Sequence, residues 1–196
     1  PKVIEFYQKR FSVSYPNEER PAARPHRTTP MYDIFNDLGA VWGHQFGLEV
    51  PNYFAQGDEP RYETPSFVRS DAFGATGREV RAVREGVGIN EVQNFGKFAV
   101  NGPNARAWLD RIMAGRVPKE GRLTLTPMLA PSGRLLGDFT ISCLGPETFQ
   151  LTASYGAQAI HQRWFEQHIE EGVTVTNISD TLTGFQLAGP RSREVL

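Results

Sequence analysis

A β-hairpin predicted in the middle of the chain constrains the fold more than any other feature. Two strand-like runs, 122–129 and 134–143, are joined by the turn sequence Ala-Pro-Ser-Gly at 130–133, where proline and glycine supply the turn dihedrals. Strands paired in a hairpin run antiparallel, so an antiparallel sheet is predicted at this point of the chain.

The second predicted strand places one acid among apolar neighbours. Successive side chains of a strand point to opposite faces. One predicted face carries Leu135, Gly137, Phe139 and Ile141, and the other carries Leu136, Asp138, Thr140 and Ser142. We expect the glycine before Asp138 to leave room for something to approach. A carboxylate on such a face is exposed, hydrogen-bonded, or shifted in pKa for chemistry. The ordinary interpretation of Asp138 is a surface or turn-satisfying aspartate, and the functional one is a residue held there for chemistry.

Composition excludes several classes of partner. The 196 residues, 39% hydrophobic and 11% aromatic, suit one domain or slightly more. The formal net charge is -1, from 21 basic and 22 acidic residues, so no overall field favours nucleic acid or an anionic membrane. No apolar run approaches the ~18 residues of a membrane span, and no signal-peptide pattern opens the chain. The single cysteine, Cys143, is interpreted as a small buried hydrophobe, and a reducing, cytoplasm-like compartment is the default.

Standard catalytic motifs are missing from the sequence. It contains no phosphate-binding Gly-x-x-x-x-Gly-Lys-[Ser/Thr], no complete dinucleotide fingerprint and no Gly-x-Ser-x-Gly elbow. His44, His161 and His168 lack metal-ligand spacing, so no metal site is predicted. His161 and His168 lie seven positions apart on one predicted helix, and we expect them on its solvated face. Asp138 is therefore the one candidate with a structural reason.

Single helices alternate with strands along the rest of the chain. Helices are predicted at 2–11, 30–38, 76–85, 103–113 and 157–170, strands at 40–46, 97–100, 148–153, 173–176 and 183–187, and a long loop at 51–75. The helix at 76–85 begins with a capping box, Thr76 and Glu79. This mixture predicts an α+β fold with mixed or antiparallel sheets and flanking helices, rather than a doubly wound parallel sheet or a helical bundle.

Two segments of the chain are similar to each other in sequence. Residues 98–109 align with 185–196, each reading as a strand, then Gly-Pro, then a helix with proline at its favoured first position. The second copy stops partway along its helix, which predicts that the natural protein continues. The alternative is a short final helix.

A series of motifs resembles the folate-binding aminomethyltransferase family, that of the glycine cleavage T-proteins. The series comprises Thr29-Pro-Met-Tyr-Asp33, Leu38-Gly-Ala40, Arg81-Ala-Val-Arg-Glu-Gly-Val-Gly88, Gly96-Lys-Phe-Ala-Val-Asn-Gly-Pro103, Pro127-Met-Leu129 and 133–138. The resemblance implies that residues 28–196 form an aminomethyltransferase-like domain, incomplete at its C-terminal side, that binds tetrahydrofolate.

The first part of the chain resembles the junction in FAD-dependent dimethylglycine and sarcosine dehydrogenases. The similar runs are 11–19, 25–30 and 46–54. This resemblance implies that residues 1–27 are a lead-in segment from a missing N-terminal FAD domain, which would hold the FAD and be the partner of this region. It also implies a mitochondrial matrix location in a eukaryote. Apolar edges left uncovered by the missing parts would favour self-association.

The resemblance to the T-proteins also assigns site residues. Asp138 matches the acid that sits against the pterin of tetrahydrofolate and assists proton movement. The matching cofactor-lining positions are Phe95, Ala99, Leu125, Thr140 and Ser142. Leu125 and Ser142 replace aromatic residues, and Gly137 stands where T-proteins carry a second aspartate.

Together, the two resemblances imply part of an oxidoreductase that demethylates dimethylglycine or sarcosine and passes the one-carbon unit to tetrahydrofolate. The fragment alone is expected to be inactive. The alternatives are a folate-inactive scaffold with the same fold, and an aminomethyltransferase of the glycine cleavage type.

Overall fold

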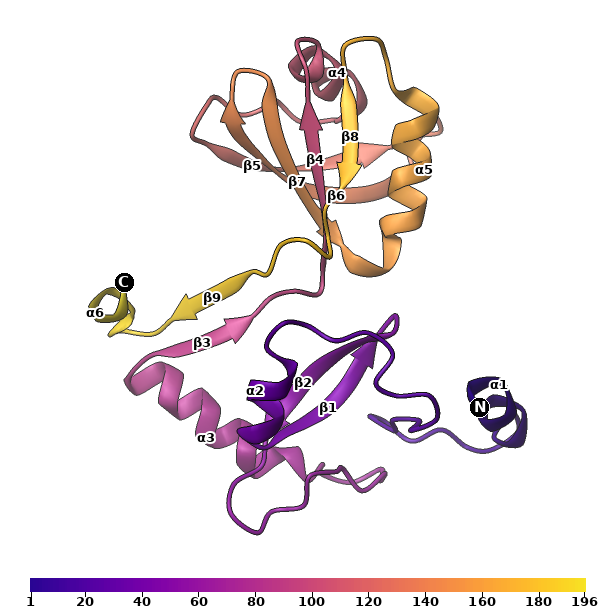
Figure 1. Ribbon diagram of the computed structural model, residues 1–196, viewed down its shortest axis with the longest axis vertical. Helices are drawn as coiled ribbons and strands as arrows, with labels where there is room; N and C mark the ends of the chain where they lie inside the picture. The colour runs from indigo at the N-terminus through magenta and orange to yellow at the C-terminus, as the bar shows by residue number, and fades with distance from the viewer. The chain divides into compact units, whose positions relative to one another are not determined.

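The computed structural model describes residues 1–196, which form two compact units (Figure 1). Unit 1 comprises residues 1–92 and 183–196, and unit 2 comprises residues 93–182.

Unit 1 is built from two small antiparallel sheets and four helices. Its elements are α1 (Lys2–Gln8), α2 (Tyr32–Asp37), β1 (Ala40–Gln45), β2 (Leu48–Phe54), α3 (Ala72–Glu85), β3 (Gly88–Glu91), β9 (Phe185–Ala188) and α6 (Ser192–Val195). Strand β1 pairs with β2 in a hairpin, and β3 pairs with β9, almost a hundred residues later, in a two-stranded ribbon. A small core of Val41, Tyr53, Ala55 and Ala75 joins the hairpin to α3.

Strand β2 corrects the prediction of a loop that starts at residue 51. Pro51 suggested a loop because proline cannot donate to a strand ladder. In the structure, the register of the hairpin shifts between Val41 and Trp42, and Pro51 lies opposite Trp42 at this irregularity. Proline is tolerated at such positions, so the strand continues through it.

The predicted capping box of α3 is also wrong. The helix begins at Ala72, so Thr76 lies inside its second turn. The Glu79 carboxylate instead accepts a hydrogen bond from the Phe54 backbone N–H at 2.8 Å. It therefore ties the helix to the end of β2.

The segment that contains Arg24 is held against the hairpin by an ion pair in which Glu49 is buried and Arg24 is half-buried. The Arg24 guanidinium donates to both carboxylate oxygens of Glu49, with Nε at 2.9 Å and Nη2 at 2.5 Å, and Nη2 also donates to the Trp42 carbonyl. Glu19 accepts from Arg24 and lies 2.7 Å from His44 Nδ1. Bidentate arginine–carboxylate geometry fixes both partners in orientation, so the charges specify where this segment packs.

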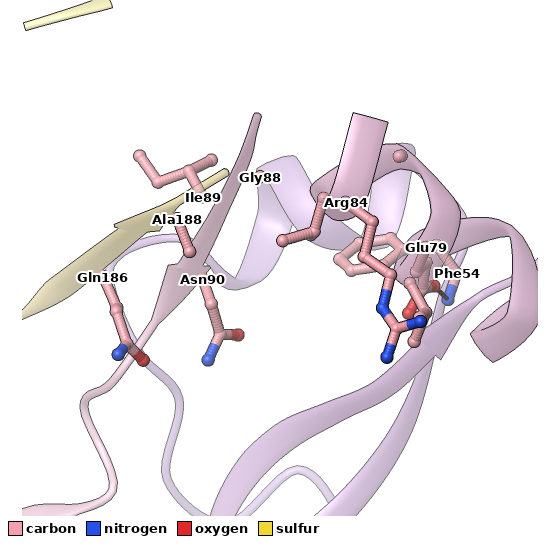
Figure 2. A pocket seen from close by; sticks show the side chains of 11 residues that line it. Phe54, Glu79, Arg84, Gly88, Ile89, Asn90, Gln186 and Ala188 are labelled. Atoms are coloured by element: carbon pink, nitrogen blue, oxygen red, sulfur yellow. Dashed lines mark hydrogen bonds between the residues drawn. The ribbon is translucent and has the colours of Figure 1, made fainter. Parts of the chain in front are cut away.

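A groove of about 520 Å³ lies in unit 1 beside α3 (Figure 2). Val80, Val83 and Arg84 line it from the helix. Ile89 and Ala188 line it from the ribbon, and the groove contains no side chain of the predicted folate site.

Unit 2 is one five-stranded antiparallel sheet with two helices. Its elements are β4 (Phe95–Asn101), α4 (Ala105–Ile112), β5 (Leu123–Leu129), β6 (Leu135–Gly145), β7 (Thr148–Ser154), η1 (Tyr155–Ala157), α5 (Gln158–His168) and β8 (Thr174–Asn177). The strand order is β5-β6-β7-β4-β8. The predicted hairpin is confirmed as β5 and β6, which pair antiparallel.

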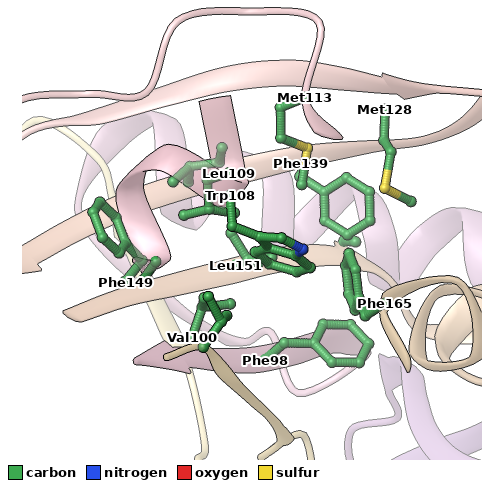
Figure 3. Packing of buried hydrophobic residues seen from close by; sticks show 14 of the residues in the cluster. Phe98, Val100, Trp108, Leu109, Met113, Met128, Phe139, Phe149, Leu151 and Phe165 are labelled. Carbon is green, nitrogen blue, oxygen red and sulfur yellow. The ribbon is translucent and has the colours of Figure 1, made fainter. Parts of the chain in front are cut away.

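One face of this sheet packs against both helices and forms the main core (Figure 3). The largest fully buried side chains there are Phe98, Trp108, Leu109, Met128, Phe139, Ile141, Phe149, Leu151 and Phe165. Trp108 of α4 meets Phe165 of α5 edge to face, and its indole N–H donates to the His168 carbonyl at 2.6 Å. Cys143 lies in the same core, as predicted for a small buried hydrophobe.

The α+β prediction is confirmed, and the two Gly-Pro segments have the same local form. Gly102 has φ +127° after β4, and Gly189 has φ +126° after β9. A Cβ on Gly102 would lie 2.2 Å from the Gly172 carbonyl oxygen, and one on Gly189 would lie 2.4 Å from the Gly86 carbonyl oxygen. Both turns therefore need glycine for backbone angle and for space.

Candidate functional site

The face of the unit 2 sheet opposite the main core brings all six predicted site residues together. We call it the open face. It carries Phe95, Lys97 and Ala99 of β4, Leu123, Leu125 and Pro127 of β5, Asp138, Thr140 and Ser142 of β6, and Gln150, Thr152 and Ser154 of β7. The pairing register and the alternation of strand side chains assign these residues to one side.

The register also gives neighbours on the open face. Leu125 lies opposite Thr140, and Thr140 lies opposite Thr152 on the next strand. Asp138 lies opposite Pro127 at one end of this row. Strand spacing makes the area over four strands about 14 Å wide, and four residues along β6 span about 14 Å. This is enough surface for a flat ring system and a substituent.

Asp138 is exposed at this face, and its carboxylate makes no hydrogen bond or ion pair within the chain. Of the three states open to a carboxylate on a sheet, the structure therefore has the exposed one. An exposed carboxylate on a rigid strand keeps all of its acceptor positions for a ligand.

Apolar and hydroxyl side chains share the open face with the acid, and the two large apolar ones lie on different strands, Leu125 on β5 and Phe95 on β4. Leu125 is 69% exposed and Phe95 is 41% exposed, although both are large and apolar. Thr140, Ser142 and Ala99 are half-buried. The open face thus offers an apolar surface beside one anion and short hydroxyl groups, as a planar ligand with a polar edge requires.

Lys97 belongs to the same face and was not among the predicted site residues. It is only 6% exposed, and its ammonium lies 3.3 Å from the Gln93 carbonyl, the Gln93 Oε1 and the Phe95 carbonyl. The alternation Phe95, Lys97, Ala99 along β4 was the available signal, because it places the lysine between two predicted lining residues.

Gly137 corrects a prediction about the room beside Asp138. The glycine faces the main core, where a Cβ would lie 2.4 Å from His161 Nε2. His161 is 1% exposed, so the expectation that it lies on a solvated helix face is also wrong. The space left by Gly137 is filled from inside the protein, and any ligand must approach Asp138 from the other side of the strand.

Other kinds of site find little support in the structure. No group of three or more histidine, cysteine, aspartate or glutamate side chains is arranged to hold a metal ion. None of the helices has the length and apolar character needed to cross a bilayer.

The fold and the open face define a class: an α+β domain whose exposed antiparallel sheet face presents one unpaired carboxylate beside apolar side chains. The family model described as the GCVT N-terminal domain matches residues 31–196. The chain therefore belongs to the GCVT N-terminal domain family.

The chain is also similar to three known proteins. Mitochondrial dimethylglycine dehydrogenase of Rattus norvegicus is 34% identical over the whole chain, which spans 23% of that relative's length. The mitochondrial pyruvate dehydrogenase phosphatase regulatory subunit of Mus musculus is 24% identical over the whole chain, again 23% of its length. The crystal structure of glycine cleavage system aminomethyltransferase T from Bartonella henselae has a TM-score of 0.71 at 20% identity, over 87% of this chain and 43% of that one. The last comparison confirms the fold, and the chain spans about a quarter of the first two relatives.

Proposed function

We propose that this chain is the tetrahydrofolate-binding segment of an FAD-dependent oxidoreductase that demethylates dimethylglycine or sarcosine and passes the one-carbon unit to tetrahydrofolate. The observation that carries the proposal is the meeting of all six resemblance-assigned residues on one open face. The similarity to a dimethylglycine dehydrogenase along the whole chain supports it. The FAD and the amine site would belong to another part of the same protein, since the chain has no flavin fingerprint.

The open face fits a pterin ring. Leu125 and Phe95 offer apolar surface on which a flat ring can lie. The Asp138 carboxylate can accept hydrogen bonds from N–H groups at the ring edge, and the hydroxyls of Thr140 and Ser142 can donate or accept. Each group matches one part of the ligand's chemistry.

Asp138 would act as the proton acceptor of the transfer. FAD, when bound, would oxidise the N-methyl amine to an iminium. A folate nitrogen would attack the iminium carbon, forming a C–N bond while the C=N electron pair moves to the amine nitrogen. The second folate nitrogen would then bond to the same carbon as the C–N bond to the demethylated amine breaks. Of the two folate N–H protons lost, one leaves with the amine and the other must be taken up by a base. Asp138 accepts that proton, and a general base in hydrogen-bond reach typically contributes ~10²–10⁴-fold. Its position within β6 holds it more rigidly than a loop would.

Substitution of the acid tests this role in the full-length protein. Asp138→Asn keeps the size of the side chain but removes the base. We expect flavin reduction by the amine to be unchanged and methylenetetrahydrofolate formation to fall ~10²-fold or more. Equal loss of both activities, or no change in either, would show that Asp138 does not have this role.

A second candidate function is a scaffold that keeps the fold without folate chemistry. Two observations favour it: the similarity to a protein named as a regulatory subunit, and the replacement of aromatic lining positions by Leu125 and Ser142. Isothermal titration of tetrahydrofolate into the full-length protein separates the two candidates. Measurable binding that weakens in a Leu125→Ala variant supports the first, and no heat of binding supports the scaffold.

The third alternative, an aminomethyltransferase of the glycine cleavage type, is tested by the reading frame. An amine-oxidising flavin domain encoded upstream in frame would exclude it.

The compartment stays a prediction, either cytoplasm-like or the mitochondrial matrix in a eukaryote, and the rat relative is named as mitochondrial.

A further inference from the structure

Strand β6 contains an irregularity directly beside Asp138. Met128 of β5 lies opposite Gly137, but the next residue, Leu129, lies opposite Leu135. Leu136 is therefore an extra residue in β6 with no partner across the ladder. Such bulges bend a strand and redirect the side chains that follow, and they are frequent next to active sites.

His161 of α5 is the side chain that contacts this bulge. Its Nε2 lies 3.3 Å from the Leu136 carbonyl oxygen. Its ring packs against Phe139 at 4.6 Å between centroids and meets Phe98 edge to face. The histidine thus reaches the strand from the core side, while Asp138 lies on the open face of the same strand.

The absence of a side chain at Gly137 makes this contact feasible. A Cβ there would lie 2.4 Å from Nε2 and 3.0 Å from Cε1 of His161. The bulge, the glycine and the histidine therefore form one local arrangement: the carbonyl of the bulged residue, a gap, and a donor that fills it.

The protonation state of the His161 imidazole agrees with a neutral ring that donates a hydrogen bond. Burial lowers the pKa of His161, and the hydrogen bond to Leu136 and the charge of Asp138 only partly oppose this effect. A neutral ring with its hydrogen on Nε2 can donate to the carbonyl, which leaves Nδ1 as a buried acceptor. No hydrogen-bond partner reaches that Nδ1. Such an unsatisfied buried group is unfavourable, so stability alone does not explain a histidine here.

We propose that His161 is a positioning residue for Asp138: its Nε2–H holds the bulged Leu136 carbonyl and so sets the direction in which the carboxylate leaves the sheet. The inference deepens the proposed function and rests on it for the role of Asp138. His161 itself touches no ligand, because the strand separates it from the open face.

A double-mutant cycle in the full-length protein tests this inference. His161→Phe keeps a ring in the aromatic cluster but removes the donor, whereas His161→Gln keeps an N–H donor. We expect His161→Phe to lower kcat for methylenetetrahydrofolate formation by ~10- to 10²-fold, since a displacement of about an ångström can cost up to ~10²-fold, with KM for tetrahydrofolate and flavin reduction unchanged. His161→Gln should restore part of the loss. In an Asp138→Asn background, His161→Phe should cause no further loss.

The same cycle contains the outcomes that would overturn the inference. An equal loss in both backgrounds would mean that His161 supports the fold without acting through Asp138. Unchanged kcat in His161→Phe would mean that the bulge needs no donor.

A measurement without ligand separates this inference from the proposed function. Amide hydrogen exchange at Gly137 and Asp138 should become about 10-fold faster in His161→Phe and recover in His161→Gln, with Ile141 of the same strand as the internal control. Unchanged exchange refutes the inference even if the protein transfers one-carbon units. A wild-type protein that forms no methylenetetrahydrofolate refutes the proposed function, while the exchange still decides whether His161 holds the strand.

Discussion

Truncation of a leucine to alanine should lower the stability of the protein much more on the core face of the unit 2 sheet than on the open face. Leu151 is fully buried in the main core, and Leu125, on the open face, is 69% exposed. Leu151→Ala should lower the free energy of unfolding by about 3–5 kcal/mol, because it removes buried carbons and leaves a cavity. Leu125→Ala removes the same three carbons, but with only about a third of the side chain buried it should cost about 0.7 kcal/mol.

Of these two truncations, Leu125→Ala should cause the larger loss of tetrahydrofolate affinity. If the pterin covers the exposed two thirds of Leu125, truncation removes about 1.7 kcal/mol of apolar burial in the complex. That corresponds to an increase in Kd of about 20-fold. Ile160 of α5 is 59% exposed and lies away from the open face, so Ile160→Ala is the matched control and should leave Kd unchanged.

Urea unfolding and isothermal titration of the full-length variants provide the two readouts. Destabilisation of Leu125→Ala as large as that of Leu151→Ala would refute the assignment of faces. A stable Leu125→Ala variant with unchanged affinity would show that the ligand does not lie on the open face. Equal weakening by Leu125→Ala and Ile160→Ala would point to a general effect on the domain rather than to contact.

Two further predictions concern groups buried inside the units. The pKa of His161 lies below its ordinary value of 6.5 in the folded protein, so the unfolded chain binds the proton more tightly. The contribution of His161 to the free energy of unfolding is therefore complete above pH 6.5. Below pH 6.5 it falls by at most about 1.4 kcal/mol per pH unit, until the pH reaches the folded pKa. Urea unfolding at pH 7.5 and 5.5 should show a loss in the wild type that is smaller in His161→Phe, and equal losses would contradict the shift. Arg24→Leu leaves the Glu49 carboxylate buried without its partner and should cost about 3–5 kcal/mol in the same assay. Glu59→Gln, at the more exposed pair with Arg78, should cost far less, because solvent screens that pair, and similar losses in both variants would contradict the difference in burial.

Local patterns predicted correctly which side chains of β6 share the open face of the sheet. The period-2 alternation of β6 placed Asp138, Thr140 and Ser142 together, and the structure has them on one face. Turn chemistry at 130–133 predicted the hairpin that positions Leu125 beside them. These features depend on residues close in sequence, so a single sequence contains the information.

The same alternation failed at the bulge. It grouped Leu136 with Asp138, yet Leu136 packs against the main core, whereas Leu135 is 63% exposed. An extra residue in a strand reverses the faces of everything before it, and here it lies against His161, 25 positions further along the chain. The pair of Arg24 with Glu49 was hidden for the same reason, since charge spacing along the chain does not show which carboxylate an arginine reaches after folding.

Gly137 shows why the direction of approach could not be predicted. A glycine beside an acid leaves space, but the sequence does not say whether a ligand or another part of the chain fills it. In this sheet the glycine and the acid point to opposite faces, so the space belongs to the interior and the carboxylate to the outside. The T-protein pattern has a second aspartate at this position, and a carboxylate placed there on this backbone would enter the aromatic cluster around His161. An aspartate at position 137 and the buried His161 thus exclude each other on this backbone, and Asp138 is the acid of this pair of positions that reaches the open face.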